Sequence, residues 1–193
     1  MNDGDRVLTL VEAHLVSVLG GDSGRASVSF LGTDRVDVLR FGPSREGLVR
    51  YVTLGMARAP MTGADADVLA QDGPRAELVL TLRGKQDSVL GKLGILASVP
   101  AVEGIVVQPG ARLELGTPLW DDAGFAAVVV GEPDPAIPAL DDPEVVILPI
   151  HPVTTNELAW ARAHGTEALI ERWTVAGTDL TDPARRAVDL GPG

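Results

Sequence analysis

The stretch Val145-Val146-Ile147-Leu148-Pro149-Ile150-His151-Pro152 is followed directly by Val153 and by Thr154-Thr155-Asn156-Glu157. Its first six residues are apolar, which predicts a buried strand over 145–150 that ends at His151-Pro152. Thr154 and Glu157 have the spacing of a capping box, so we expect a helix to begin there and to end before Gly165. A buried strand joined to a helix in this way is typical of a sheet with helices packed on it.

Similar patterns extend in both directions from this stretch. Apolar side chains at helical spacing predict helices over 6–19 and 86–99, the second ended by Pro100, and a last helix from Thr166 to Trp173. Apolar runs bounded by turn residues predict strands over 26–31, 35–41, 48–54, 77–82, 110–115 and 125–130. The sequence therefore predicts a single α/β (α+β) domain with a central mixed β-sheet flanked by helices.

Length and composition are consistent with one domain. The chain has 193 residues, 45% of them hydrophobic, which suits an ordinary apolar core and excludes disorder. We expect the domain to occupy residues 1–180, and the polar residues 181–193 to form a frayed C-terminal tail.

Charge and cysteine content narrow the function. Sixteen basic against 27 acidic residues give a net charge of −11, which argues against direct nucleic-acid binding and allows a basic protein partner. The same charge is equally consistent with a role in solubility alone. The chain has no cysteine, an acidic start at 1–5 and no apolar run long enough to cross a bilayer, so we expect a cytoplasmic protein.

Motifs that carry chemistry are missing. The segment 21–24 does not have the Gly-x-Ser-x-Gly spacing of a nucleophile elbow, and no phosphate-binding loop follows Gly84. The three histidines are too far apart in sequence to form a group by spacing, and Asp65 with Asp67 lacks the remaining ligands of a calcium loop. We therefore expect no catalytic residue, no metal site and no cofactor.

One stretch is unusual in its charge, because residues 113–161 contain no Lys or Arg. Four prolines and five acids between Gly131 and Glu144 predict an exposed, stiffened loop that loses little entropy on binding. A solvated connector between two strands is the alternative interpretation. The candidate partner-binding residues are Asp121, Asp122, Glu132, Asp134, Asp141, Asp142 and Glu144.

Four blocks of sequence, 51–61, 77–82, 108–120 and 147–170, follow one another within residues 45–175. Together they resemble the suppressor of fused family in its bacterial, single-domain form. The resemblance implies an α/β domain with a mixed sheet, no known enzymatic activity and no cofactor. The best-known animal member regulates a transcription factor by binding it, and bacterial relatives include proposed immunity proteins against secreted toxins. From the resemblance we expect this chain to end where the second domain of the animal protein would begin.

The leading hypothesis is therefore a non-enzymatic protein-binding module, such as an immunity or regulatory protein that binds and neutralises a partner protein through an acidic surface. The first alternative is an enzyme that uses His151 and a nearby carboxylate as an acid–base pair. The second is a structural homo-oligomer. Three tryptophans, Trp120, Trp160 and Trp173, are candidates either for interface anchors or for core residues.

Overall fold

The computed structural model describes residues 2–29, 33–63 and 73–191 of the chain. The helices are α1 (Asp3–Leu19), α2 (Val89–Glu103), α3 (Thr155–His164) and α4 (Thr166–Ala176), with a short 3-10 helix η1 (Met56–Arg58). The strands are β1 (Gly24–Val28), β2 (Val36–Phe41), β3 (Leu48–Leu54), β4 (Ala76–Arg83), β5 (Arg112–Glu114), β6 (Ala127–Val130), β7 (Leu140–Asp141) and β8 (Glu144–Val153).

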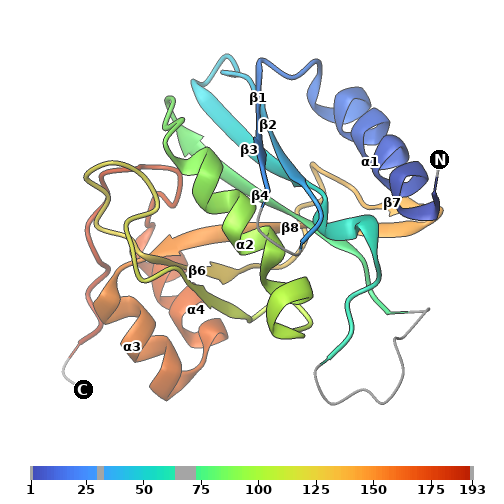
Figure 1. Cartoon of the computed structure of the whole chain (residues 1–193). Coiled ribbons are helices and arrows are strands. Elements are labelled where there is room, and N and C mark those ends of the chain that lie inside the picture. Colours follow the sequence, from blue (N-terminus) through green and yellow to red (C-terminus); the bar gives the residue numbers. More distant parts are fainter. Residues whose placement is uncertain (1, 30–32, 64–72, 192–193) are drawn as a thin grey trace.

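The strands form one mixed sheet in the order β1-β2-β3-β4-β8-β6-β5, and β7 pairs with the start of β8 (Figure 1). Strands β1 to β4 are antiparallel neighbours, β4 and β8 are parallel, and β6 is antiparallel to β8. The predicted fold class, a mixed sheet in a single domain flanked by helices, is thus confirmed.

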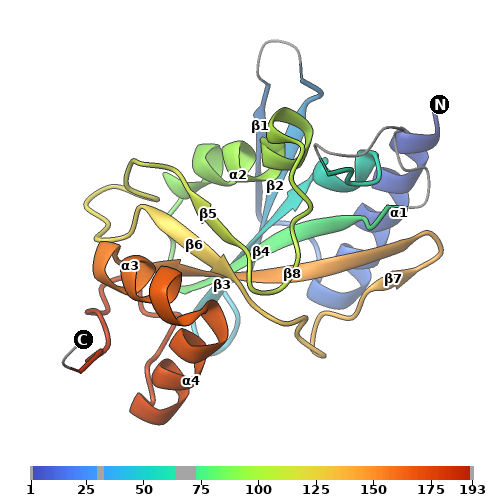
Figure 2. The same cartoon turned by 90° about the horizontal axis from the view of Figure 1, so that it is seen from below.

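Helices cover both faces of this sheet (Figure 2). On one face α1 packs against β2, β3 and β8, and α3 and α4 pack against β6 and the end of β8. On the other face α2 packs over the first strands, where Leu93 and Leu96 are fully buried. Alternate side chains of β8 point to opposite faces of the sheet. Ile147 packs in the cluster on the α1 side, and Leu148 packs in the cluster on the α2 side.

Strand β8 is longer than predicted. It continues through His151 and Pro152 to Val153, and Pro152 pairs with Val128 of β6. The pairing of β8 with β4 ends at Pro149, so Pro152 has a strand neighbour on one side only. A proline is tolerated there because its missing N–H has no ladder partner to lose.

Helix α2 also continues past its predicted end. Pro100 lies inside the helix, which stops at Gly104 instead. Gly104 adopts a left-handed conformation with φ 64°, and its N–H donates to the carbonyl of Pro100. The glycine, which tolerates this conformation without the penalty of a side chain, is the effective stop signal.

Three residues of the segment expected to form a frayed tail contact the domain. The side chain of Arg185 is only 5% exposed, and Val188 and Leu190 pack against the cluster around Trp173. Arg185 forms an ion pair with the buried carboxylate of Glu157 on α3. The polar composition of the segment gives no sign of this contact.

No helix among the described residues combines the length and the apolar character needed to cross a membrane.

Candidate protein-binding surface

Most of the ion pairs in the described residues lie outside the cation-free stretch. Arg25 pairs with Glu12 of α1, Arg40 with Asp87, and Arg58 with Asp5. These pairs neutralise much of the acidic charge on the first half of the chain. The unbalanced charge of the molecule is therefore concentrated elsewhere.

The candidate acids carry much of that unbalanced charge. All seven are exposed, and none forms an ion pair with another described residue. Asp134 has a local role, because one of its carboxylate oxygens accepts the N–H of Ala136 at 2.8 Å. The stretch from Leu113 to Ala161 has no cation of its own, and of its acids only Glu114 and Glu157 pair with a described residue, Arg162 and Arg185.

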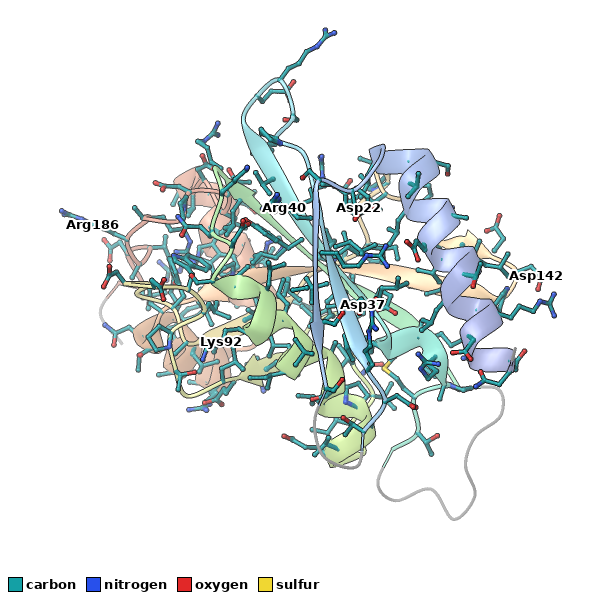
Figure 3. All side chains as sticks on the ribbon, turned by 45° about the horizontal axis from the view of Figure 1, so that its top comes forward. Asp22, Asp37, Arg40, Lys92, Asp142 and Arg186 are labelled. Carbon is teal, nitrogen blue, oxygen red and sulfur yellow. The ribbon has the colours of Figure 1, made fainter. Side chains whose placement is uncertain are left out.

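The structure divides the seven acids into two groups. Asp121 and Asp122 lie on the loop between β5 and β6, where the N–H of Asp121 donates to Ser88 Oγ at 3.1 Å, beside the start of α2. The other five lie on the connection from β6 to the beginning of β8, on the side of α1 (Figure 3, Asp142). The ten-residue strand β8 spans about 30 Å, and the two aspartate pairs lie near its opposite ends.

The connection from β6 to β8, predicted as a uniformly exposed loop, is anchored in its middle. Ile137 is only 2% exposed and packs in the cluster under α1. The Nε2 atom of His14 is 2.7 Å from the carbonyl oxygen of Pro138. These contacts hold the segment against α1, and the five acids that flank the anchor remain in solvent. We call the five, Glu132, Asp134, Asp141, Asp142 and Glu144, the β6–β8 acids.

His151 is placed differently from what an acid–base role requires. Its ring lies edge-on to Trp173, with ring centroids 6.2 Å apart, and a Cβ added at Gly131 would come within 2.7 Å of Nε2. Burial, with a smaller effect of the Arg185 charge, lowers its pKa to about 4. In the described part of the chain no carboxylate hydrogen bonds to this ring. The geometry gives the enzyme alternative no support.

The lowered pKa of His151 predicts a measurable acid sensitivity. The unfolded chain, with a histidine pKa near 6.5, binds the proton first, so this group contributes full stability above pH 6.5 and loses it as the pH falls towards 4. The loss is expected to reach about 2–3 kcal/mol, at roughly 1.4 kcal/mol per pKa unit. Urea unfolding of the wild type and of His151→Gln, at several pH values, measures the difference.

The exposed His164→Gln serves as the matched control for that experiment. A ring of His151 that titrates near its ordinary pKa in an NMR experiment would contradict the prediction.

Glu77 is a buried acid whose structural role was not predicted, because the run 77–82 was interpreted only as a buried apolar strand. It is fully buried, and its carboxylate accepts the Thr53 hydroxyl at 2.6 Å. It also accepts the N–H groups of Gly55, Met56 and Ala57 at 2.7, 3.3 and 3.0 Å. Burial raises the pKa of Glu77, and these hydrogen bonds, which favour the charged form, oppose the rise. A single acid at the start of a mainly apolar run was the available signal.

Glu157 has a second role beyond the capping box that its spacing predicts. The capping box is present, with Thr154 Oγ1 accepting the N–H of Glu157. The carboxylate also receives Arg185 at 2.8 Å and the indole N–H of Trp173 at 2.9 Å. Burial acts to raise the pKa of Glu157, but the hydrogen bonds, led by that from Arg185, hold it below its ordinary value.

The tryptophans divide between core and surface. Trp120 and Trp173 are 4% and 2% exposed and belong to the core. Trp160 is half-buried on α3, where its ring stacks on His164 with centroids 4.3 Å apart. Of the three, only Trp160 retains accessible surface that an interface could use.

In the described residues no group of three or more His, Asp or Glu side chains is arranged to hold a metal ion.

The arrangement of strands and helices defines a class of protein: a single α+β domain on a mixed sheet, with unpaired carboxylates on its surface. The sequence profile of the Suppressor of fused protein (SUFU) family matches residues 32–186. The chain belongs to this family, as its four sequence blocks had indicated.

Solved structures with the same fold agree. A suppressor of fused homologue from Neisseria gonorrhoeae FA 1090 has a TM-score of 0.74 at 16% identity, covering 97% of this chain and 100% of its own. The Sufu–Fu complex matches with a TM-score of 0.66 at 14% identity, over 94% of this chain and 91% of that one. At these identities the likeness establishes the fold.

Suppressor of Fused from Drosophila matches with a TM-score of 0.67 at 14% identity, over 94% of this chain. This chain spans 50% of the Drosophila protein's length. A search of curated protein sequences finds no match to this chain.

Proposed function

We propose that this chain is a non-enzymatic module that binds a basic partner protein in the cytoplasm and neutralises or regulates it, as an immunity protein does with a toxin. Membership of the suppressor of fused family supports a binding role, because the family includes a protein solved as the Sufu–Fu complex. The observation that carries the proposal is the set of seven exposed carboxylates without an ion-pair partner in the described residues.

Unpaired surface carboxylates favour a basic partner for a physical reason. Complementary charge accelerates encounter and disfavours wrong partners, and these acids lose no internal ion pair on binding. If the partner is a nuclease-like toxin, the carboxylates take the place of substrate phosphates and block its active site. The β6–β8 acids are the larger group and lie on an anchored segment, so we place the main contact there.

The first experiment is affinity capture from the host at low and moderate salt, with partners identified by mass spectrometry. The triple variant Asp141→Asn, Asp142→Asn, Glu144→Gln is then compared with wild type against the captured partner. We expect at least about a tenfold loss of affinity and a flatter salt dependence, because three charges are removed from the contact.

The variant Glu167→Gln, Glu171→Gln removes two exposed carboxylates of α4 outside the candidate set and is the matched control. The pair Asp121→Asn, Asp122→Asn removes the second candidate group, near the other end of β8. A loss confined to this pair would move the contact to the β5–β6 loop. Unchanged affinity in both the triple variant and this pair would reject the acidic surface altogether.

A further inference from the structure

Most of the exposed large hydrophobic side chains in the described residues belong to one segment of the chain. Of the five in the described residues, three belong to α2 and the residue that follows its cap: Ile95 at 36%, Val102 at 61% and Ile105 at 40% exposed. The other two, Val16 and Val175, lie on α1 and α4. We call Ile95, Val102 and Ile105 the α2 ridge.

The ridge exists because α2 is apolar on both sides. Its inner side buries Leu93, Leu96 and Ala97 against the sheet. Its outer side carries Ile95 and Val102, which are seven residues and so about two turns apart on the same side of the helix. A surface helix ordinarily turns charged residues to solvent, and a helix apolar all round is typical of an element covered on both sides.

Charges near the ridge indicate what could cover it. The exposed pair Asp121 and Asp122 lies on the loop bonded to Ser88, just before the first turn of α2, and Glu103 is exposed at its last turn. Lys92, near the start of α2 (Figure 3), donates a hydrogen bond from its ammonium group to Thr117 Oγ1 at 3.0 Å. A second copy of a chain with net charge −11 would bring like charges together, whereas a partner with Lys or Arg would complement both ends.

We propose that the α2 ridge is a docking surface for a segment of a partner protein that has an apolar face flanked by Lys or Arg, such as a basic amphipathic helix. This inference rests on the proposed function and deepens it, because it adds an apolar contact to the acidic one. Apolar residues of the partner cover Ile95, Val102 and Ile105, and its cations meet Asp121, Asp122 and Glu103.

The test uses a synthetic helical peptide of about 18 residues, roughly five turns, with Leu on one face and Lys on the other. Its counterpart has Glu in place of Lys. Titration of the isotope-labelled protein is expected to show binding of the Lys peptide alone, with NMR shift changes centred on the α2 ridge. The double variant Val102→Ser, Ile105→Ser should weaken binding about tenfold or more.

The matched control is Val175→Ser on α4, which removes an isolated valine that is 83% exposed and should leave affinity unchanged. Circular dichroism and thermal unfolding verify that both variants fold. Shift changes centred on the β6–β8 acids, with affinity unchanged in the double variant, would overturn the ridge and leave the proposed function standing.

Two further outcomes count against the ridge as stated. Failure of the Lys peptide to bind overturns it, and the partner captured from the host tests the proposed function separately. A dimer in sedimentation velocity that the double variant abolishes would show that a second copy covers the ridge instead.

Discussion

Replacing Glu77 by Ala is expected to lower the free energy of unfolding by about 4 kcal/mol at neutral pH. The change leaves the N–H groups of Gly55, Met56 and Ala57 buried without their acceptor, together with the Thr53 hydroxyl. Each unsatisfied buried donor costs about 1–3 kcal/mol, and relaxation of η1 recovers part of the sum. Urea denaturation followed by far-ultraviolet circular dichroism measures the loss.

The variant Glu77→Gln separates charge from shape in this site. Its amide keeps one acceptor oxygen but turns an NH₂ group towards backbone donors, so we expect an intermediate loss of about 2 kcal/mol. The control is Glu103→Ala, an exposed acid at the end of α2 whose removal should leave the unfolding midpoint unchanged. A loss below about 1 kcal/mol for Glu77→Ala would show that water replaces the carboxylate.

The pH dependence of this loss has a definite sign. The pKa of Glu77 is raised in the folded protein, so its contribution is fully present below the unfolded pKa and falls as the pH rises through the folded value. The difference between wild type and Glu77→Ala should therefore be larger near about pH 4 than near pH 8.

Replacing Arg185 by Ala is expected to cost about 3–4 kcal/mol. Arg185 is 5% exposed, and its guanidinium donates to both oxygens of the fully buried Glu157 and to the carbonyl of Pro152. It also lies over the rings of Phe125 and Trp173, with its Cζ 5.0 and 5.1 Å from their centroids. Removing one partner of a buried pair leaves the other charge uncompensated, which accounts for the size of the effect.

A double-mutant cycle tests whether the ion pair between Arg185 and Glu157 accounts for this loss of stability. Arg185→Met keeps much of the side-chain volume, and adding Glu157→Gln removes the stranded charge, so the double variant should be more stable than the sum of the single losses predicts. Arg83→Ala is the control, because the Arg83–Asp179 pair joins the same segment but is exposed, and such pairs contribute at most about 1 kcal/mol. Additive losses in the cycle would contradict the assignment.

Elements governed by near neighbours in the sequence were predicted well. Strand β3 occupies the predicted range 48–54, and the capping box at Thr154 opens α3 as expected. Errors occurred where the environment outweighs the local signal. Pro152 continues β8 because its open side needs no N–H, and Pro100 lies inside α2, which a glycine ends.

The acids of the candidate surface can be listed from the sequence, but their arrangement in space cannot. The excess of acid in 113–161 is visible in the sequence, but the lack of ion pairs at the seven acids is not, because Glu114 and Glu157 of the same stretch pair with Arg162 and Arg185. The division of the seven acids into two groups follows from the path of β8, whose ends lie about 30 Å apart. No local sequence pattern predicts how far apart the two groups of acids lie.

By itself the sequence determined the fold class, the helix cap and the excess of negative charge, because each depends on residues a few positions apart or on composition. Tertiary structure alone decided how Glu77 is satisfied by a turn 20–24 residues earlier, and how Arg185 reaches Glu157 across 28 residues. It also decided that one apolar side of α2 remains in solvent. Periodicity shows that a side is apolar, but what covers that side depends on elements distant in the chain.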